Sequence, residues 1–156
     1  MPHIPVNHPM RPFFRTLAGL VGLYVLVFGI LGVVQTWGDA LFARDSTWVL
    51  GLRTNLAFAI MSVLFGTFIM IGSVTGGNLG HFISLAIGVI FLSAGLVMLA
   101  VQRTDLNLLN FSMANVIVSF LFGLLFLATG FYDKVSSPRE AFTEKRFRGR
   151  HATSER

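Results

Sequence analysis

The sequence predicts an all-α polytopic membrane protein with four transmembrane helices, and three observations lead to this fold class. Hydrophobic residues make up 54% of the 156 residues and charged residues only 12%, whereas about 25% charged residues is usual in a soluble domain. The apolar residues gather in four blocks of about twenty, the length that a helix needs to cross the hydrocarbon layer. Inside these blocks there is no Asp, Glu, Lys, Arg or His.

The four blocks define one transmembrane domain over residues 16–132. Because backbone groups in lipid must pair with one another, each block is expected to be helical. Residues 1–15 contain four of the five prolines, which predicts an extended N-terminal arm. Residues 133–156 form a basic tail. The helices are expected at residues 16–36, 55–75, 82–101 and 111–132.

The distribution of basic residues predicts the orientation in the membrane. Nine of the twelve Lys and Arg residues lie on the side shared by the two termini. Since basic residues are concentrated on the cytoplasmic side of a membrane protein, both termini are expected in the cytoplasm of a bacterial cell, with the chain in the plasma (inner) membrane. The nine residues are Arg11, Arg15, Lys134, Arg139, Lys145, Arg146, Arg148, Arg150 and Arg156.

Two segments outside the blocks are candidates for lipid or partner contact. Trp37 and Trp48 lie in the loop after the first block, and tryptophan is typical of the membrane interface. This loop is expected to lie flat at the headgroups, with docking of an extracytoplasmic partner as the alternative. The net charge of +5 sits largely in the tails and predicts contact with anionic headgroups, not with nucleic acid. A topology anchor and a contact with an acidic partner are the other interpretations of the tail cluster Lys145, Arg146, Arg148 and Arg150.

Small residues recur seven positions apart in every block. Two helical turns separate the members of each pair, so both lie on one helix face, where small residues let membrane helices approach closely. Aligning Gly66 with Gly123 also matches several flanking residues without a gap, which predicts two tandem helical hairpins. The pairs are Gly22 and Gly29, Gly66 and Ser73, Gly88 and Gly95, and Gly123 and Gly130.

The residues needed for catalysis or for a cofactor are missing from the blocks. There is no cysteine, which excludes disulfides, thiolate catalysis and iron–sulfur clusters. His3, His8, His81 and His151 lie in the tails or in the turn before the third block, so two intramembrane haem ligands are not expected. We expect no catalytic residues, no metal and no cofactor. Among the polar residues of the blocks, Asn115 is expected to join helices and Asn55 to cap one.

Residues 49–55, with sequence VLGLRTN, followed by Gly66 and preceded by a glycine-rich first block, resemble a known family. The sequence is similar to small four-helix actinobacterial membrane proteins of a domain-of-unknown-function family, over roughly residues 11–132. Members often have histidines where this chain has Phe58 and Ser62. The resemblance implies a four-helix membrane fold and no particular activity.

Two functions are expected from these observations. The first is a non-catalytic accessory subunit that packs on a larger integral membrane complex. In size and character the chain is similar to subunits associated with the actinobacterial cytochrome bcc–aa3 respiratory supercomplex, part of the electron transport chain. The alternative is a small homo-oligomeric transporter or channel for a neutral solute or a lipid. An enzyme is not expected, because the blocks contain no acid or base.

Overall fold

The structure is a computed structural model, and it describes residues 9–45 and 47–134. The basic tail cluster Lys145, Arg146, Arg148 and Arg150 lies outside the described residues. All four helices found among the described residues are long and apolar enough to cross a membrane, which confirms the predicted fold class. The elements are α1 (Arg11–Gln35), β1 (Trp48–Val49), β2 (Leu52–Arg53), α2 (Leu56–Thr75), α3 (Gly77–Val101) and α4 (Met113–Asp133).

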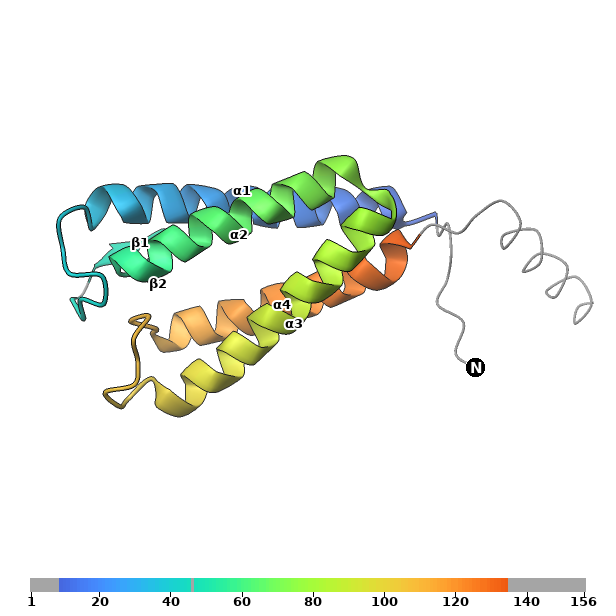
Figure 1. The fold of residues 1–156 in the computed structure, drawn as a ribbon. Coiled ribbons are helices and arrows are strands. Elements are labelled where there is room, and N and C mark those ends of the chain that lie inside the picture. Colours follow the sequence, from blue (N-terminus) through green and yellow to red (C-terminus); the bar gives the residue numbers. More distant parts are fainter. Residues whose placement is uncertain (1–8, 46, 135–156) are drawn as a thin grey trace, which may run out of the picture.

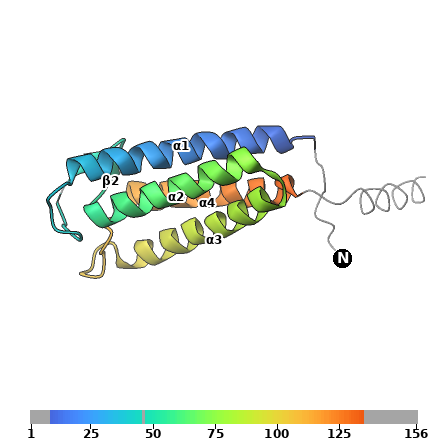
Figure 2. The same cartoon turned by 45° about the horizontal axis from the view of Figure 1, so that its top comes forward.

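The helices form two hairpins, α1 with α2 and α3 with α4, and most helix contacts lie inside these pairs. The hairpins meet near the α2–α3 turn and diverge toward the opposite end of the bundle (Figures 1 and 2). We call the end that holds Arg11, Gly76 and Asp133 the terminal end, and the other the loop end. The short strands β1 and β2 pair antiparallel at the loop end, with Trp48 opposite Arg53.

Two predicted boundaries are wrong, both at the terminal end. Residues 11–15 were predicted in the extended arm, but α1 begins at Arg11 with proline in its first turn, where a missing N–H removes no helical hydrogen bond. His81 was predicted in a turn, but α3 begins at Gly77 and contains it. Gly76 and Gly77 both have φ of 63°, and glycine adopts this conformation at little cost. The chain therefore reverses direction at these two glycines, and α3 begins almost directly after the end of α2.

The predicted cap of the second helix is confirmed. Asn55 has an extended backbone, and its side chain accepts a hydrogen bond from the Phe58 N–H at 2.9 Å. A side-chain oxygen at this position satisfies a backbone donor that has no partner within the helix. α2 therefore begins at the loop end directly after β2.

The small residues lie at the interfaces inside each hairpin. A Cβ atom on Gly66 would lie 2.6 Å from the backbone N of Leu26, and one on Gly29 would lie 2.5 Å from the backbone N of Val63. Both distances are well below ordinary van der Waals contact, so the α1 and α2 backbones approach closely only because these side chains are absent. Gly22 also belongs to this interface, as does Ser73, whose hydroxyl donates to Arg15 O at 2.9 Å.

The second hairpin is built in the same way. Added Cβ atoms on Gly88 and Gly123 would lie 2.9 Å from Leu127 N and 3.0 Å from Leu92 N. The glycine faces of α3 and α4 therefore point at each other and not at the first hairpin. The remaining small residues of this interface are Gly95, which faces Ser119 and Phe120, and Gly130, which faces Leu85.

Candidate functional site

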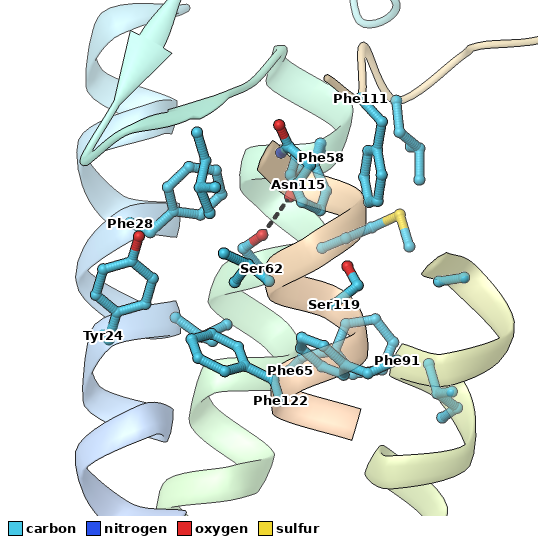
Figure 3. A pocket seen from close by; sticks show the side chains of 17 residues that line it. Tyr24, Phe28, Phe58, Ser62, Phe65, Phe91, Phe111, Asn115, Ser119 and Phe122 are labelled. Atoms are coloured by element: carbon cyan, nitrogen blue, oxygen red, sulfur yellow. Dashed lines mark hydrogen bonds between the residues drawn. The ribbon is translucent and has the colours of Figure 1, made fainter. Parts of the chain in front are cut away.

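A cavity of about 110 Å³ lies between the two hairpins, toward the loop end. It is bordered by side chains of all four helices and of the two loop-end connections. Most of the lining is apolar, and Figure 3 shows aromatic rings on several sides of it. The aromatic residues that line the cavity are Tyr24, Phe28, Phe58, Phe65, Phe91, Phe111 and Phe122.

The rings form contacts that run from helix to helix around the cavity. Tyr24 of α1 meets Phe122 of α4 with ring centroids 5.8 Å apart, and Phe122 is 6.2 Å from Phe91 of α3. Phe91 in turn is 6.5 Å from Phe65 of α2. These edge and tilted geometries are the arrangements that aromatic pairs prefer. Bulky rings between the hairpins keep them apart, and a space remains among the rings.

Toward the terminal end the interior is filled. Buried aliphatic and aromatic side chains from all four helices pack into one cluster there, and of this cluster only Val25 also borders the cavity. Close-packed interiors of this kind leave no room for a solute. The cavity therefore ends about midway along the bundle. The cluster consists of Ala18, Val21, Val25, Ile69, Ile87 and Phe126.

Asn115 closes the loop end of the cavity. Its Nδ2 donates to Arg53 O at 2.8 Å, and its Oδ1 accepts from Arg53 N at 3.1 Å, so the side chain pairs with β2 as another strand would. The same Oδ1 accepts from the Ser112 hydroxyl at 2.7 Å and from the Ser112 N–H at 3.2 Å, and the second bond belongs to a capping box at the start of α4. The residue is 2% exposed. Asn115 thus joins a helix to a loop strand, whereas the sequence suggested a bond between helices.

Two further asparagines, which the sequence reasoning missed, complete this closure. Asn110 donates to Thr54 O at 3.0 Å and to Asp45 O at 2.7 Å. The Asn107 side chain accepts a hydrogen bond from the Phe111 N–H and donates one to the Phe111 carbonyl oxygen. Asn110 also has φ of 56°, a conformation that asparagine tolerates better than most residues. The signal was present as two asparagines in a short connection. We call Asn55, Asn107, Asn110 and Asn115 the asparagine cap; all four are buried.

The β1–β2 hairpin covers the α1 side of the same end. Its buried Val49 and Leu52 pack with Phe28, and the Tyr24 hydroxyl donates to Leu50 O at 2.9 Å. Trp48, on the opposite face, is 51% exposed. Successive side chains of the hairpin thus point to opposite sides, with Val49 and Leu52 inward and the Trp48 indole outward. Tryptophan is typical of the membrane interface, where an outward indole can lie among the headgroups.

The connections beyond the hairpin are exposed. Trp37 directly follows the C-cap of α1 and is 79% exposed. Arg44 and Asp105 form an exposed ion pair with Nη1 and Oδ1 2.7 Å apart, which links the α1–α2 and α3–α4 connections. An exposed pair of this kind adds little stability.

The terminal end holds the charged groups of the helices. Arg11 Nε donates to Asp133 Oδ1 at 2.6 Å, and the Asp133 side chain is only 3% exposed. Arg15 donates to Ser73 O at 2.5 Å and also to Val74 O, so a cation satisfies carbonyls at the C-terminus of α2, where the helix dipole favours positive charge. These groups tie α1 to α4 and to α2.

His81 is buried in α3 near the same end. Its Nδ1–H donates to Gly130 O at 2.6 Å, so the ring joins α3 to α4. Among residues 9–45 and 47–134, no three His, Asp or Glu side chains gather in a way that could hold a metal ion. The geometry of both ends therefore supports structural roles for their polar side chains.

The model of a domain of unknown function, DUF4383, matches residues 15–132. The chain belongs to the DUF4383 family. This membership confirms the unknown-function family expected from the sequence. The DUF4383 match covers α2, α3, most of α1 and α4, the asparagine cap and the cavity, whereas Arg11 and Asp133 at the helix ends lie just outside it. No curated protein and no solved structure matches the chain.

Proposed function

We propose that this DUF4383 protein is a non-catalytic accessory subunit that packs on a larger integral membrane complex. One observation carries the proposal: the buried ionisable side chains of the described helices are engaged in structural contacts. Asp133 pairs with Arg11, and His81 donates to a backbone carbonyl. A catalytic acid or base must be in hydrogen-bond reach of a substrate, and neither group faces the cavity. We therefore also propose that the protein is not an enzyme.

The outer faces of the helices are the surfaces available to a partner. The glycine faces are already used inside the hairpins, so a partner would meet large apolar side chains. Leu20 on α1 is 59% exposed, Phe68 on α2 is 55% exposed, and Leu96 on α3 is 63% exposed. In the bilayer these side chains contact lipid, and a partner helix of complementary shape can replace that lipid through van der Waals packing.

Affinity purification in a mild detergent tests the association. A tagged protein expressed in its native membranes is expected to recover one membrane complex in stoichiometric amount. Recovery only as a monomer or homo-oligomer would contradict the proposal. Leu20→Trp and Leu96→Trp change the outer faces of two different helices, α1 and α3, by the same kind of substitution, so each serves as the control for the other. The variant that loses the partner identifies the docking face.

The first partner to test is the respiratory supercomplex of actinobacteria. The size of the chain and its inert interior support this choice. Haem-bearing subunits in the purified material would support it, whereas a different stoichiometric complex would remove the respiratory assignment and leave the accessory role. The tail variant with Lys145, Arg146, Arg148 and Arg150 all changed to Gln tests whether the tail binds this partner or only anionic lipid.

We also propose that both termini lie in the cytoplasm, with the chain in the plasma membrane of a bacterium. The ion pair of Arg11 with Asp133 supports one side for both termini, and the basic residues gathered on that side support the cytoplasm. The chain has no cysteine, so single cysteines can be introduced cleanly. In intact spheroplasts, Asp39→Cys should react with a membrane-impermeant maleimide and Arg150→Cys should not. The reverse pattern would invert the topology.

A homo-oligomeric transporter for a neutral solute or a lipid is the second candidate, and the cavity is the observation that favours it. Transport needs a path to both sides, however, and the asparagine cap and the packed cluster bound the cavity at its two ends. Flux through reconstituted vesicles that falls in a Ser119→Ala variant would support this function. Ser119 is the better choice than Asn115, because Asn115 also holds β2 in place.

A further inference from the structure

We propose that the cavity binds a membrane-soluble, mostly apolar molecule that carries a flat ring and one hydrogen-bond-accepting oxygen. The molecule would reach the cavity sideways from the bilayer, between α2 and α3, and receive a hydrogen bond from the hydroxyl of Ser119. This inference concerns a ligand site and holds whether or not the protein packs on a larger complex.

The cavity opens toward the lipid between α2 and α3. Its loop end is covered by the asparagine cap, and its other end by the packed cluster. On the side between α2 and α3, two lining residues are themselves exposed on the outside of the bundle: Met61 is 38% exposed and Ile90 is 41% exposed. These residues lie within transmembrane helices. A molecule that enters between them comes from the lipid and not from water.

The polar side chains that line the cavity differ in whether they have hydrogen-bond partners. The Tyr24 hydroxyl donates to Leu50 O, the Ser62 hydroxyl donates to Phe58 O at 2.8 Å, and Asn115 pairs with Arg53. Ser119 is different. It is 6% exposed and borders the cavity, and no hydrogen bond joins its hydroxyl to another described residue. Its oxygen is not fully buried, unlike Arg53 Nε, which is a fully buried side-chain atom without a partner among the described residues. Figure 3 shows its side chain among the residues that border the cavity.

A hydroxyl that faces an apolar cavity favours a ligand that can accept a hydrogen bond from it, because a polar group removed from water without a partner is costly. Water is a poor occupant here, since a buried water usually needs two to four polar partners and the lining is almost wholly apolar. The aromatic lining favours a flat ring, which can make edge and offset contacts. A dry cavity of about 150 Å³ is known to hold one benzene ring. The present cavity, at about 110 Å³, is smaller, so it suits at most a single ring, and any substituent would extend into the opening between α2 and α3.

A pair of matched probes tests this chemistry. 4-Fluoroacetophenone has a ring and a carbonyl oxygen, and 4-fluoro-α-methylstyrene replaces that oxygen by a CH₂ group of similar shape. Each is added to the purified protein in nanodiscs and observed by ¹⁹F NMR, with unlabelled acetophenone as competitor and empty nanodiscs as the blank. We expect the ketone to bind saturably and about fivefold more tightly than the olefin, as one hydrogen bond would give.

Two variants assign the binding to the cavity. Ser119→Ala should lower the affinity for the ketone about fivefold and leave the olefin unchanged. Ala94→Phe places a ring in the cavity and should reduce binding of both probes at least about tenfold. Its control is Ala86→Phe, the same substitution on the exposed side of α3, which should bind both probes as the wild type does. Thermal unfolding of each variant verifies the fold, and Ala94→Leu replaces Ala94→Phe if the larger side chain prevents folding.

Three results would overturn the proposal. Equal binding of ketone and olefin, unchanged in Ser119→Ala, would mean that the cavity takes only hydrocarbon, such as an acyl chain. Equal effects of Ala94→Phe and Ala86→Phe would place the probes outside the cavity. Binding that does not saturate above the empty nanodiscs would mean that no specific site exists.

Discussion

The interfaces inside the hairpins and the interface between them are built from side chains of opposite size. Inside each hairpin, glycines such as Gly66 and Gly123 let backbone face backbone. Between the hairpins, rings such as Phe91 and Phe122 meet with centroids 6.2 Å apart, and a cavity remains. In lipid, helices gain little from hiding apolar surface and much from close packing. We infer that the first kind of interface supplies most of the stability and that the second supplies space for binding.

Substitution of a hairpin glycine should have the largest effect. The Cβ atom of Gly66→Leu would lie 2.6 Å from Leu26 N and 2.7 Å from Leu26 Cα, so the helices must separate. We expect the free energy of unfolding to fall by about 3 kcal/mol or more, as measured by titration with SDS in mixed micelles. The control is Thr67→Leu, one position further and exposed, which should change it by less than about 0.5 kcal/mol. Equal losses in the two variants would contradict the close approach of α1 and α2.

Loss of the asparagine cap should weaken one end only. Asn115→Leu leaves the backbone N–H and C=O of Arg53 without their partners, and we expect a loss of about 2 kcal/mol in the free energy of unfolding. Amide hydrogen exchange provides the internal control. The amide of Arg53 should lose protection, whereas that of Gly76, which donates to Gly72 O at the terminal end, should keep it. A uniform loss along the chain would show that the two ends unfold together.

The two ion pairs should differ in strength according to burial. The Asp133 side chain is 3% exposed, whereas that of Asp105 is fully exposed. A double-mutant cycle with Arg11→Gln and Asp133→Asn should give a coupling free energy of about 1.5 kcal/mol. The matched cycle with Arg44→Gln and Asp105→Asn should give about 0.5 kcal/mol. Salt screens exposed charges much more than buried ones. The coupling free energy of the Arg11–Asp133 pair should therefore be similar in high and low salt, whereas that of the Arg44–Asp105 pair should fall in high salt.

Two serines provide the finest comparison. The Ser73 hydroxyl donates to Arg15 O at 2.9 Å across the α1–α2 interface, so Ser73→Ala should lower the free energy of unfolding by about 0.6 kcal/mol, an average value for membrane proteins. Ser119→Ala should change it by about zero in the absence of a ligand, because its hydroxyl borders the cavity and no hydrogen bond joins it to another described residue. A clear loss in Ser119→Ala would mean that this hydroxyl has a structural partner.

Several features of the site were accessible to sequence reasoning and others were not. Asn55 follows a charged loop and precedes an apolar block, so its role as a cap depends only on neighbours in sequence. Asn107 and Asn110 lie in a connection without periodicity, and their partners are local in one case and 56 residues away in the other. A pattern along the chain cannot reveal the second kind of contact. The same limit hid the cavity, because its rings come from all four helices.

By itself, the sequence determined the four crossings, the pairing of helices into hairpins and the small faces of those helices. These properties follow from block length, from the lack of charges within the blocks and from spacings of seven residues, all of which act locally. Only the tertiary structure decided that the faces carrying Gly29, Gly66, Gly88 and Gly123 turn inward to their own hairpin partners, whereas Gly72 of α2 faces Ile83 of α3. It also decided that Ser119 borders a cavity while Ser73 bonds to a neighbouring helix. The physical reason is that a helix face can meet several neighbours equally well, and side-chain volume across the bundle selects among them.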